Sequence, residues 1–360
     1  MTERILRARM PELDAIRGIA ILMVMVYHGF YWQVDLTSCP RWEKLLMTCA
    51  WSGRLGVDLF FVLSGFLITG LLLDSRSRTD YYSRFYVRRA LRILPAYFAM
   101  LLVLAVAHQL PWRFGLLSLS YLSNLTPLFG VAVAYPVLWS LAVEEHFYLI
   151  WPAIVRRTDL NALLVICAGV VVASPLFRFA SFHHARGFEF NDYTWNSADG
   201  LACGAILAIF LRKTQGSQNS LRLMVITSGC IAVLLSRFAI LSRTATGLGA
   251  ALQVVPWHAA FVALLGSFLL MGSSPNRQVV QGPILLFLGR ISYGLYLVHL
   301  WVFSVCGRYL ASYNIVTRFV VAASISVLLA YLSRTYFEEY FLRLKESPPL
   351  MRARIARPCV

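Results

Sequence analysis

The sequence predicts an all-α fold, a polytopic membrane bundle of about ten transmembrane helices with both termini in the cytoplasm. Three observations lead to this prediction. Of the 360 residues, 59% are hydrophobic and only 14% are charged, whereas about a quarter of the residues of a soluble domain are charged. The apolar residues gather in runs of about 20, the length that crosses a hydrocarbon core of ~30 Å. The basic residues gather in short clusters between these runs, as they do in membrane proteins.

Each long apolar run is expected to form one membrane-spanning helix. The stretch 115–130 is apolar but short and ends in turn-forming residues, so we expect it to be interfacial or re-entrant. No repeat or linker interrupts the chain, which predicts one transmembrane domain, 12–341, between a cytoplasmic N-terminal segment, 1–11, and a basic cytoplasmic tail, 342–360. The predicted spans are 12–33, 54–73, 86–108, 137–155, 160–178, 197–213, 221–241, 250–272, 284–305 and 317–341.

The distribution of positive charge gives the expected orientation. The chain has 33 Lys and Arg residues and a formal net charge of +16. With the N-terminus in the cytoplasm, most of these residues lie at the inner ends of the predicted helices, as the positive-inside rule requires. Loop clusters of this kind indicate topology, so we expect the lipid bilayer as a partner and no nucleic acid. The chain is expected to be a multi-pass protein of the cell membrane, in bacteria the inner membrane.

Cysteine and histidine spacing predicts no metal site. Cys39 and Cys49 share one predicted loop and can pair if that loop faces an oxidising compartment. The adjacent residues His183 and His184 are unsuited to ligating one ion together. No other spacing in the chain matches a zinc-ligand pattern.

The first predicted span carries two costly polar groups, Arg17 and His28. Eleven residues separate them, which is about 16 Å and close to three helical turns, so both side chains are expected on one helix face. Ionisable groups in hydrocarbon usually face a cavity or a partner. His28 therefore either fixes packing through a hydrogen bond or acts as a general base, since an imidazole titrates near neutrality.

Other predicted spans carry polar groups at a similar outer depth. Glu144 and Glu145 lie in "LWSLAVEEHFYLIWP", about two turns from its outer end. Asp58 and Asp199 lie near the outer starts of their helices and can equally be simple helix-start residues. Structural hydrogen bonds are the alternative for each group, although several such groups together favour a site, because each is costly to insert. The candidate acceptor or site-shaping residues are Asp58, Ser64, Asp199, Ser292, Tyr293, Tyr296 and His299.

The inner side carries an arginine cluster in "FYVRRALRILPAYF". Arg88, Arg89 and Arg92 stand at the cytoplasmic start of the third predicted span. Arginines in this place can anchor the topology or bind anionic lipid headgroups. Two arginines one turn apart also suit a phosphate group, because guanidinium donates bidentate hydrogen bonds.

Together these motifs resemble the acyltransferase 3 family of integral-membrane O-acyltransferases. The matching pieces are the spacing of Arg17 and His28, "GVDLFFVLSGFLI", "RALR", "LWSLAVEEHFYLIWP", "SADGLACGAIL" and "ISYGLYLVHL". The resemblance extends from Leu13 to about Phe341, and its specificity lies in the order of the pieces rather than in any single one.

The resemblance implies transfer of an acyl group, most often acetyl, from cytoplasmic acyl-CoA to a hydroxyl of a cell-envelope or secreted carbohydrate or glycolipid. Some family members act on macrolides or other small molecules instead. It also implies that His28 is catalytic and that Glu144 assists it or holds the site. Arginines of the "RALR" motif, here Arg89 and Arg92, are associated with the CoA phosphates. With Arg88 and Arg17, which are expected at the same cytoplasmic face, they are the candidate CoA-binding residues: Arg17, Arg88, Arg89 and Arg92. Acyl-CoA is expected as a co-substrate, with no tightly bound cofactor.

These expectations form a mechanistic hypothesis in which CoA phosphates stay at the arginines while the pantetheine arm carries the thioester toward His28. His28 then either deprotonates the acceptor hydroxyl or carries the acyl group itself. The loop 178–197 contacts the acceptor, or simply connects two spans. Two hypotheses lie outside the enzyme class. The first is a proton-coupled transporter, because intramembrane His, Glu and Asp also build proton relays. The second is a non-catalytic component that binds a lipid-linked glycan.

Overall fold

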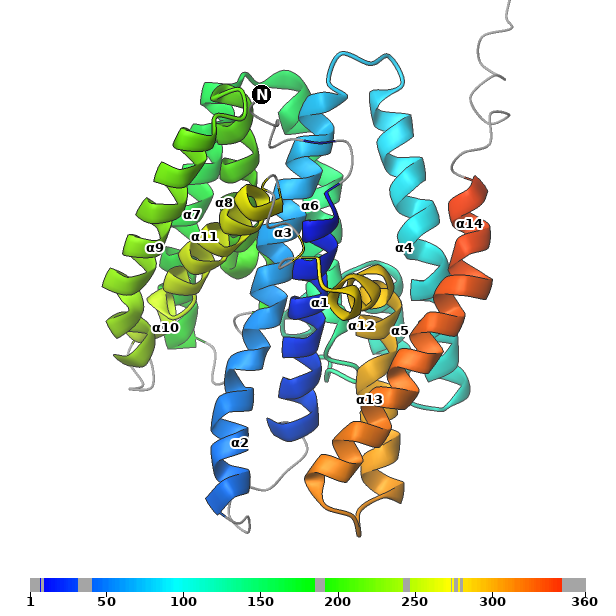
Figure 1. The fold of residues 1–360 in the computed structure, drawn as a ribbon. Helices are drawn as coiled ribbons and strands as arrows, with labels where there is room; N and C mark the ends of the chain where they lie inside the picture. Colours follow the sequence, from blue (N-terminus) through cyan, green and yellow to red (C-terminus); the bar gives the residue numbers. More distant parts are fainter. Residues whose placement is uncertain are drawn as a thin grey trace, which may run out of the picture.

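A computed structural model describes the chain at residues 7, 10–31, 41–184, 192–241, 247–272, 274, 278 and 281–344. Within these residues every regular element is helical, which confirms the predicted all-α fold (Figure 1). The elements in chain order are α1 (Pro11–Val26), η1 (Tyr27–Tyr31), α2 (Arg41–Trp51), η2 (Ser52–Leu55), α3 (Gly56–Asp74), α4 (Tyr81–Val106), α5 (Trp112–Leu119), η3 (Ser123–Phe129), α6 (Leu138–Arg157), α7 (Leu160–His184), α8 (Thr194–Lys213), α9 (Gln218–Leu241), α10 (Gly247–Leu252), α11 (Val255–Gly272), α12 (Pro283–Tyr309), α13 (Ile315–Leu332), η6 (Ser333–Glu338) and α14 (Glu339–Leu344).

Among the described residues, nine helices are long and apolar enough to cross a membrane. They coincide with nine of the ten predicted spans, and the chain is an integral membrane protein. The predicted fourth span, 137–155, is the helix α6, which is not one of the nine. Glu144, Glu145 and His146 lower the hydropathy of α6 below that of the other helices.

Two features differ from simple spans. The stretch 115–130 folds into α5 and η3, which are both too short to cross a bilayer. The helix α2 precedes α3 and was not predicted, because its mixture of polar and apolar residues contains no long apolar run. Its apolar side chains include Trp42, which is 50% exposed, and Leu45, which is 66% exposed.

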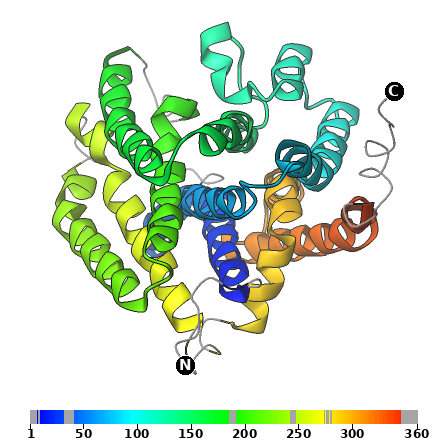
Figure 2. The ribbon, with the colours of Figure 1, turned by 90° about the horizontal axis from the view of Figure 1, so that it is seen from above.

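The helix α1 lies in the middle of the bundle with α3 and α12 against it (Figure 2). Close approach of α1 and α12 depends on two glycines. A Cβ atom at Gly18 would lie 2.3 Å from the carbonyl oxygen of Leu285, and one at Gly289 would lie 1.8 Å from that of Asp14. Only hydrogen fits at these two positions, as is common where membrane helices cross closely.

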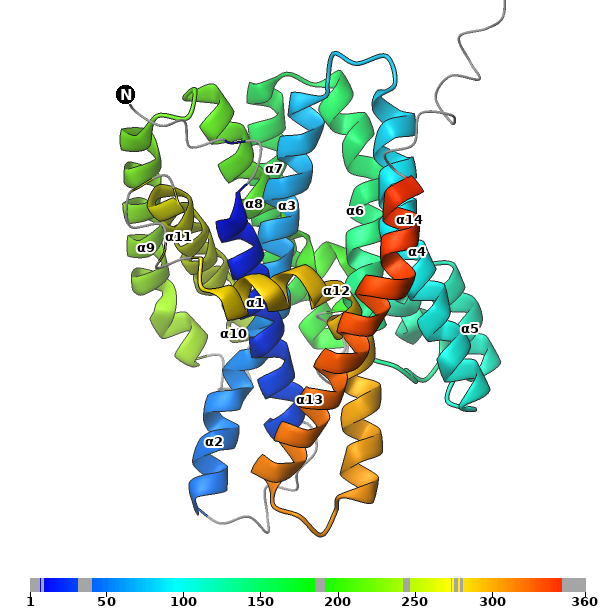
Figure 3. The same cartoon turned by 45° about the vertical axis from the view of Figure 1, so that its right-hand side comes forward.

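The helix α12 changes direction after this crossing. Leu285 faces Gly18 and Gly289 faces Asp14, so this part of α12 advances toward the N-terminal end of α1. His299 nevertheless contacts His28, near the opposite end of the same span. If α12 were straight, the ten residues from Gly289 to His299 would continue it by about 15 Å along its own axis, away from His28. Figure 3 shows α12 crossing α1 and then turning to run alongside it.

Candidate functional site

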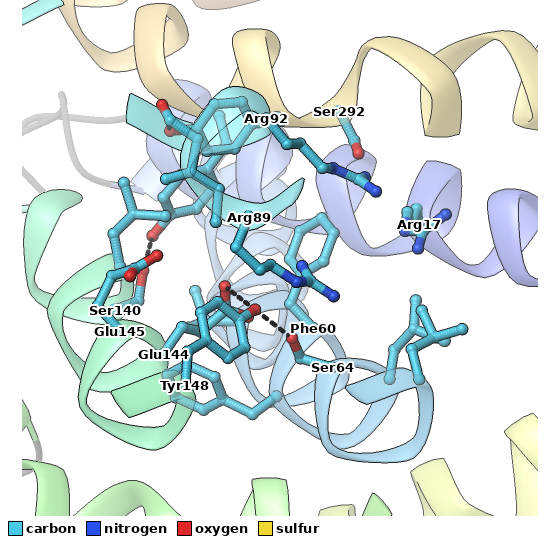
Figure 4. Close-up of a pocket in the computed structure, with 18 residues that line it drawn as sticks. Arg17, Phe60, Ser64, Arg89, Arg92, Ser140, Glu144, Glu145, Tyr148 and Ser292 are labelled. Carbon is cyan, nitrogen blue, oxygen red and sulfur yellow. Dashed lines mark hydrogen bonds between the residues drawn. The ribbon is translucent and has the colours of Figure 1, made fainter. Parts of the chain in front are cut away.

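A cavity opens between α1, α3, α4, α6 and α12, and it gathers most of the predicted site residues (Figure 4). We call it the arginine cavity, because Arg17, Arg89 and Arg92 line it from α1 and α4. Its remaining lining residues are Val57, Phe60, Phe61, Leu63, Ser64, Leu67, Ile93, Ser140, Leu141, Glu144, Glu145, Tyr148, Ser292, Tyr293 and Tyr296.

The three arginines give the cavity a concentrated positive charge. Arg17 forms an ion pair with Asp14. Arg89 lies over the ring of Tyr148, 4.8 Å from its centroid, a cation–π contact that orders the side chain. Within the part of the chain that the structure describes, Arg89 and Arg92 form no ion pair. Such a group of cations is suited to a polyanionic ligand.

The fourth candidate arginine, Arg88, does not line the cavity. It is half-buried and lies next to Arg89 on α4, whose successive residues point about 100° apart. The structure therefore brings together three of the four candidate CoA-binding residues.

A hydrogen-bonded chain holds Glu144 at the wall of the cavity (Figure 4). The hydroxyl of Tyr148 donates to the carboxylate of Glu144 at 3.0 Å. That hydroxyl has one proton, so it accepts from Ser64 at 2.7 Å. Glu145 lines the same cavity, so both glutamates of the motif face it. Among the described residues, the Glu144 carboxylate thus has Tyr148 as its hydrogen-bond donor and makes no hydrogen bond with His28.

The helix α12 contributes Ser292, Tyr293 and Tyr296 to the cavity wall. Tyr293 connects α12 with α4, because its hydroxyl donates a hydrogen bond to the carbonyl of Ile93 at 2.8 Å. The ring of Tyr296 lies 5.7 Å from that of His299, which is not a lining residue. Tyr296 therefore marks the boundary between the arginine cavity and the second polar centre of the site.

That second centre is a pair of buried histidines, His28 and His299. Their exposed fractions are 8% and 0%, and His299 Nε2 lies 3.2 Å from His28 Nδ1. His28 stands in η1, a single π-helical turn at the end of α1. Such turns occur often at functional sites. The prediction that Arg17 and His28 share one face is based on 3.6 residues per turn, which holds in α1 up to Val26; Arg17 lines the arginine cavity and His28 does not.

Hydrogen bonds fix the proton positions in the neutral pair. His299 Nδ1 lies 3.1 Å from the carbonyl of Leu295, which can only accept, so Nδ1 carries the proton and Nε2 the lone pair. His28 Nδ1 lies 3.0 Å from the carbonyl of Val24 and must donate as well. It therefore donates both to Val24 and to His299 Nε2. The lone pair of His28 consequently lies on Nε2.

The two candidate aspartates lie apart from the cavity, in an ion network with Arg178 and His258. Asp199 contacts Arg178 at 2.8 Å and His258 at 3.4 Å, and all three side chains are at least 97% buried. His258 Nε2 lies 3.0 Å from Asp58. Asp58 and Asp199 thus join α3, α7, α8 and α11. Sequence reasoning missed Arg178 and His258, although each is a polar residue within an apolar run.

Several sequence predictions concern residues outside the described structure. Cys39 lies there, so its pairing with Cys49 stays a prediction, as do the roles of residues 185–191 in the loop 178–197 and of the tail beyond residue 344. The side chains of His183 and His184 are also outside it. Among the described residues, no group of three His, Cys, Asp or Glu side chains is arranged to hold a metal ion.

The fold and the site define a polytopic helical membrane protein with a cationic cavity beside a buried histidine pair. Residues 10–335 match a family model described as an acyltransferase domain. The chain belongs to this family, the acyltransferase 3 family, in agreement with the resemblance of its motifs.

Individual relatives are similar over different shares of the chain. Peptidoglycan O-acetyltransferase OatA of Listeria monocytogenes is 31% identical over 42% of this chain and 25% of its own length. Putative peptidoglycan O-acetyltransferase YrhL of Bacillus subtilis is 31% identical over 45% of this chain and 28% of its own. A putative O-acetyltransferase of Staphylococcus aureus is 27% identical over 92% of this chain, which spans 57% of that protein. No solved structure matches the chain.

Proposed function

We propose that this chain is a membrane O-acyltransferase that moves an acyl group, acetyl by default, from cytoplasmic acyl-CoA to a hydroxyl of a cell-envelope carbohydrate. The observation that carries this proposal is the gathering of Arg17, Arg89 and Arg92 around one cavity, next to the buried pair of His28 and His299. Family membership supports the acyl-transfer chemistry.

The arginine cavity is the proposed donor site. CoA carries several phosphate charges, and Arg89 and Arg92 offer guanidinium groups that have no carboxylate partner among the described residues. The pantetheine arm is long and largely uncharged, and it suits the apolar wall formed by Val57 and Phe60. Phosphates at the arginines thus leave the thioester pointing into the bundle, toward Tyr296.

The thioester reaches His28 when the side chain of Tyr296 moves aside. The hydroxyl of Tyr296 lies 2.6 Å from that of Ser140 and donates to the carbonyl of Val137 at 3.2 Å. These two contacts hold the ring between the cavity and His299. Displacement of one tyrosine side chain would connect the donor site with the histidine pair.

The chemistry needs one nitrogen, His28 Nε2. In direct transfer, Nε2 takes the proton of the acceptor hydroxyl, and the hydroxyl oxygen attacks the thioester carbon. The new C–O bond forms, the C–S bond breaks, and the CoA thiolate leaves and takes the proton from Nε2. In the relay route, Nε2 attacks the thioester carbon first, the C–S bond breaks and the CoA thiolate leaves. The acceptor hydroxyl then attacks the acyl carbon, the bond from Nε2 to that carbon breaks, and the hydroxyl proton passes to the thiolate. General-base help of this kind contributes about 10²–10⁴-fold to the rate.

His299 supports both routes as the acceptor for His28 Nδ1–H. When His28 becomes positively charged, its Nδ1–H is a stronger donor to Val24 and His299. This is the orienting role that a carboxylate has in a hydrolase triad. The carboxylate of Glu144, held by Tyr148, instead shapes the wall of the arginine cavity.

The proposed acceptor is the glycan of peptidoglycan, because two of the similar proteins carry that substrate in their names. The outer end of α1, where His28 lies, is the side from which such an acceptor approaches in the predicted orientation. The histidine pair then joins a cytoplasmic donor to an acceptor outside the membrane.

The test is label transfer in membranes that contain the protein. Acetyl-labelled acetyl-CoA is added, and the glycan, lipid and small-molecule fractions are separated. We expect label in the glycan fraction, lost in His28→Asn. The matched control is His108→Asn, which changes an exposed histidine in the turn after α4, where φ is 54° and asparagine is well tolerated. Equal label with wild type and His28→Asn would overturn the proposal.

A further inference from the structure

We propose that Tyr135, outside every motif used above, is the positioning residue that sets His299 against His28. The inference rests on the proposed function, because it assigns a role to a residue that acts through the histidine pair. Tyr135 lies between η3 and α6, is 5% exposed, and belongs to neither the helix of His28 nor that of His299.

The turned half of α12 needs an external anchor. The first half of α12 is fixed where Leu285 and Gly289 cross α1, and it leads away from His28. His299 reaches its place only because α12 changes direction between residues 289 and 299. Helices change direction sharply where a side chain joins the backbone hydrogen-bond ladder.

The hydroxyl of Tyr135 makes such a contact. It donates to the carbonyl of Leu297 at 2.7 Å and accepts from the amide of Trp301 at 3.1 Å. Leu297 and Trp301 are four residues apart, the spacing of partners within an α-helical ladder. They stand two residues before and two residues after His299. One side-chain oxygen therefore holds the single turn that carries this histidine.

The same segment also contacts α12 one turn earlier. Ser140 and the carbonyl of Val137 hold the hydroxyl of Tyr296. Residues 135–140, the start of α6 and the three residues before it, thus contact α12 on both sides of His299. The contacts of Tyr135 are with the backbone of α12, whereas those of Val137 and Ser140 are with the side chain of Tyr296, so the position of the His299 turn depends on Tyr135.

Removal of the Tyr135 hydroxyl lets the turn of His299 move. The contact between His299 Nε2 and His28 Nδ1 is 3.2 Å, already at the outer limit of a good hydrogen bond. A small shift breaks it and removes one of the two acceptors that orient the His28 ring, the other being the carbonyl of Val24. The arginines of the donor cavity lie on α1 and α4, so donor binding is expected to stay intact.

The first experiment reads the histidines directly, with no need for activity. The purified full chain, labelled with ¹⁵N in the rings of its seven histidines, is studied by solid-state NMR in lipid. In Tyr135→Phe we expect the ring signals of His28 and His299 to change and the other five to stay. The control is Tyr81→Phe, another buried tyrosine whose hydroxyl donates to a carbonyl, that of Pro152 at 3.0 Å.

The second experiment is a double-mutant cycle on transfer activity. Tyr135→Phe is expected to lower kcat about 100-fold, the scale of an ångström-sized misplacement, with the KM for acetyl-CoA within about twofold of wild type. The variant that combines it with His299→Gln is expected to lose no more than His299→Gln alone, because Tyr135 acts through His299.

The outcomes separate this inference from the proposed function. Unchanged signals of both histidines in Tyr135→Phe, or changes in all seven, would overturn the positioning role, as would losses that multiply in the cycle. Transfer that survives His28→Asn would instead overturn the proposed function, and the NMR comparison would still decide whether Tyr135 sets the pair.

Discussion

Arg92→Gln is expected to weaken donor binding and to leave the chemical step nearly unchanged. A hydrogen bond to a charged group contributes about 1.5–3 kcal/mol, and each ~1.4 kcal/mol corresponds to a tenfold change in affinity. Arg17 and Arg89 line the same cavity as Arg92. Removing the charge of Arg92 therefore also removes some repulsion between like charges in the empty site, which offsets part of the lost binding energy. The loss is therefore expected near the lower bound, about a 10-fold rise in the KM for acetyl-CoA.

The assay measures initial transfer rates over a range of donor concentrations. Arg88→Gln is the matched comparison, because Arg88 lies on the same helix and does not line the cavity, and its KM is expected near that of wild type. A second donor, an acetyl thioester of pantetheine without phosphates, should show no difference between Arg92→Gln and wild type. Equal KM values for acetyl-CoA, or equal losses with both donors, would refute the assignment of Arg92 to the phosphates.

Three further predictions concern the frame of the site. Gly289→Ala places a Cβ 1.8 Å from the carbonyl oxygen of Asp14, so we expect a loss of about 1–3 kcal/mol in thermal unfolding and loss of transfer. Gly229→Ala, where nothing lies within 4 Å, should unfold no earlier than wild type. Asp199→Asn removes the carboxylate partner of a buried arginine and should cost about 3–5 kcal/mol in the same assay. Ser140→Ala removes one hydrogen bond of about 1 kcal/mol that holds Tyr296, so kcat should rise about fivefold; a fall in kcat would contradict the proposed path.

The spans could be predicted from sequence because the bilayer leaves the backbone few choices. A chain that crosses hydrocarbon must satisfy its own amides, so apolar runs of about 20 residues become helices. The same criterion overlooked α2, which is only 11 residues long and of mixed polarity. It also gives no sign of the π-turn at His28, since a π-turn depends on neighbouring helices rather than on the apolar content of its own residues.

The arginine cavity was more predictable than the histidine pair. Arg89 and Arg92 are one turn apart on a single helix, so their common face follows from helical spacing alone. The contact of His28 with His299 joins residues 271 positions apart and depends on the change of direction in α12. The links of Asp58 and Asp199 to His258 likewise arise only when three helices, α3, α8 and α11, pack together, so helical periodicity within one segment does not predict them.

The central claim is that His28 performs the transfer while the arginine cavity holds the donor. The most direct measurement uses the purified chain in lipid nanodiscs, with labelled acetyl-CoA and glycan fragments of peptidoglycan, and records donor affinity and transfer in the same preparation. We predict that His28→Asn binds acetyl-CoA as tightly as wild type and transfers no label, while His108→Asn does both. Transfer by His28→Asn at the rate of wild type would contradict the account.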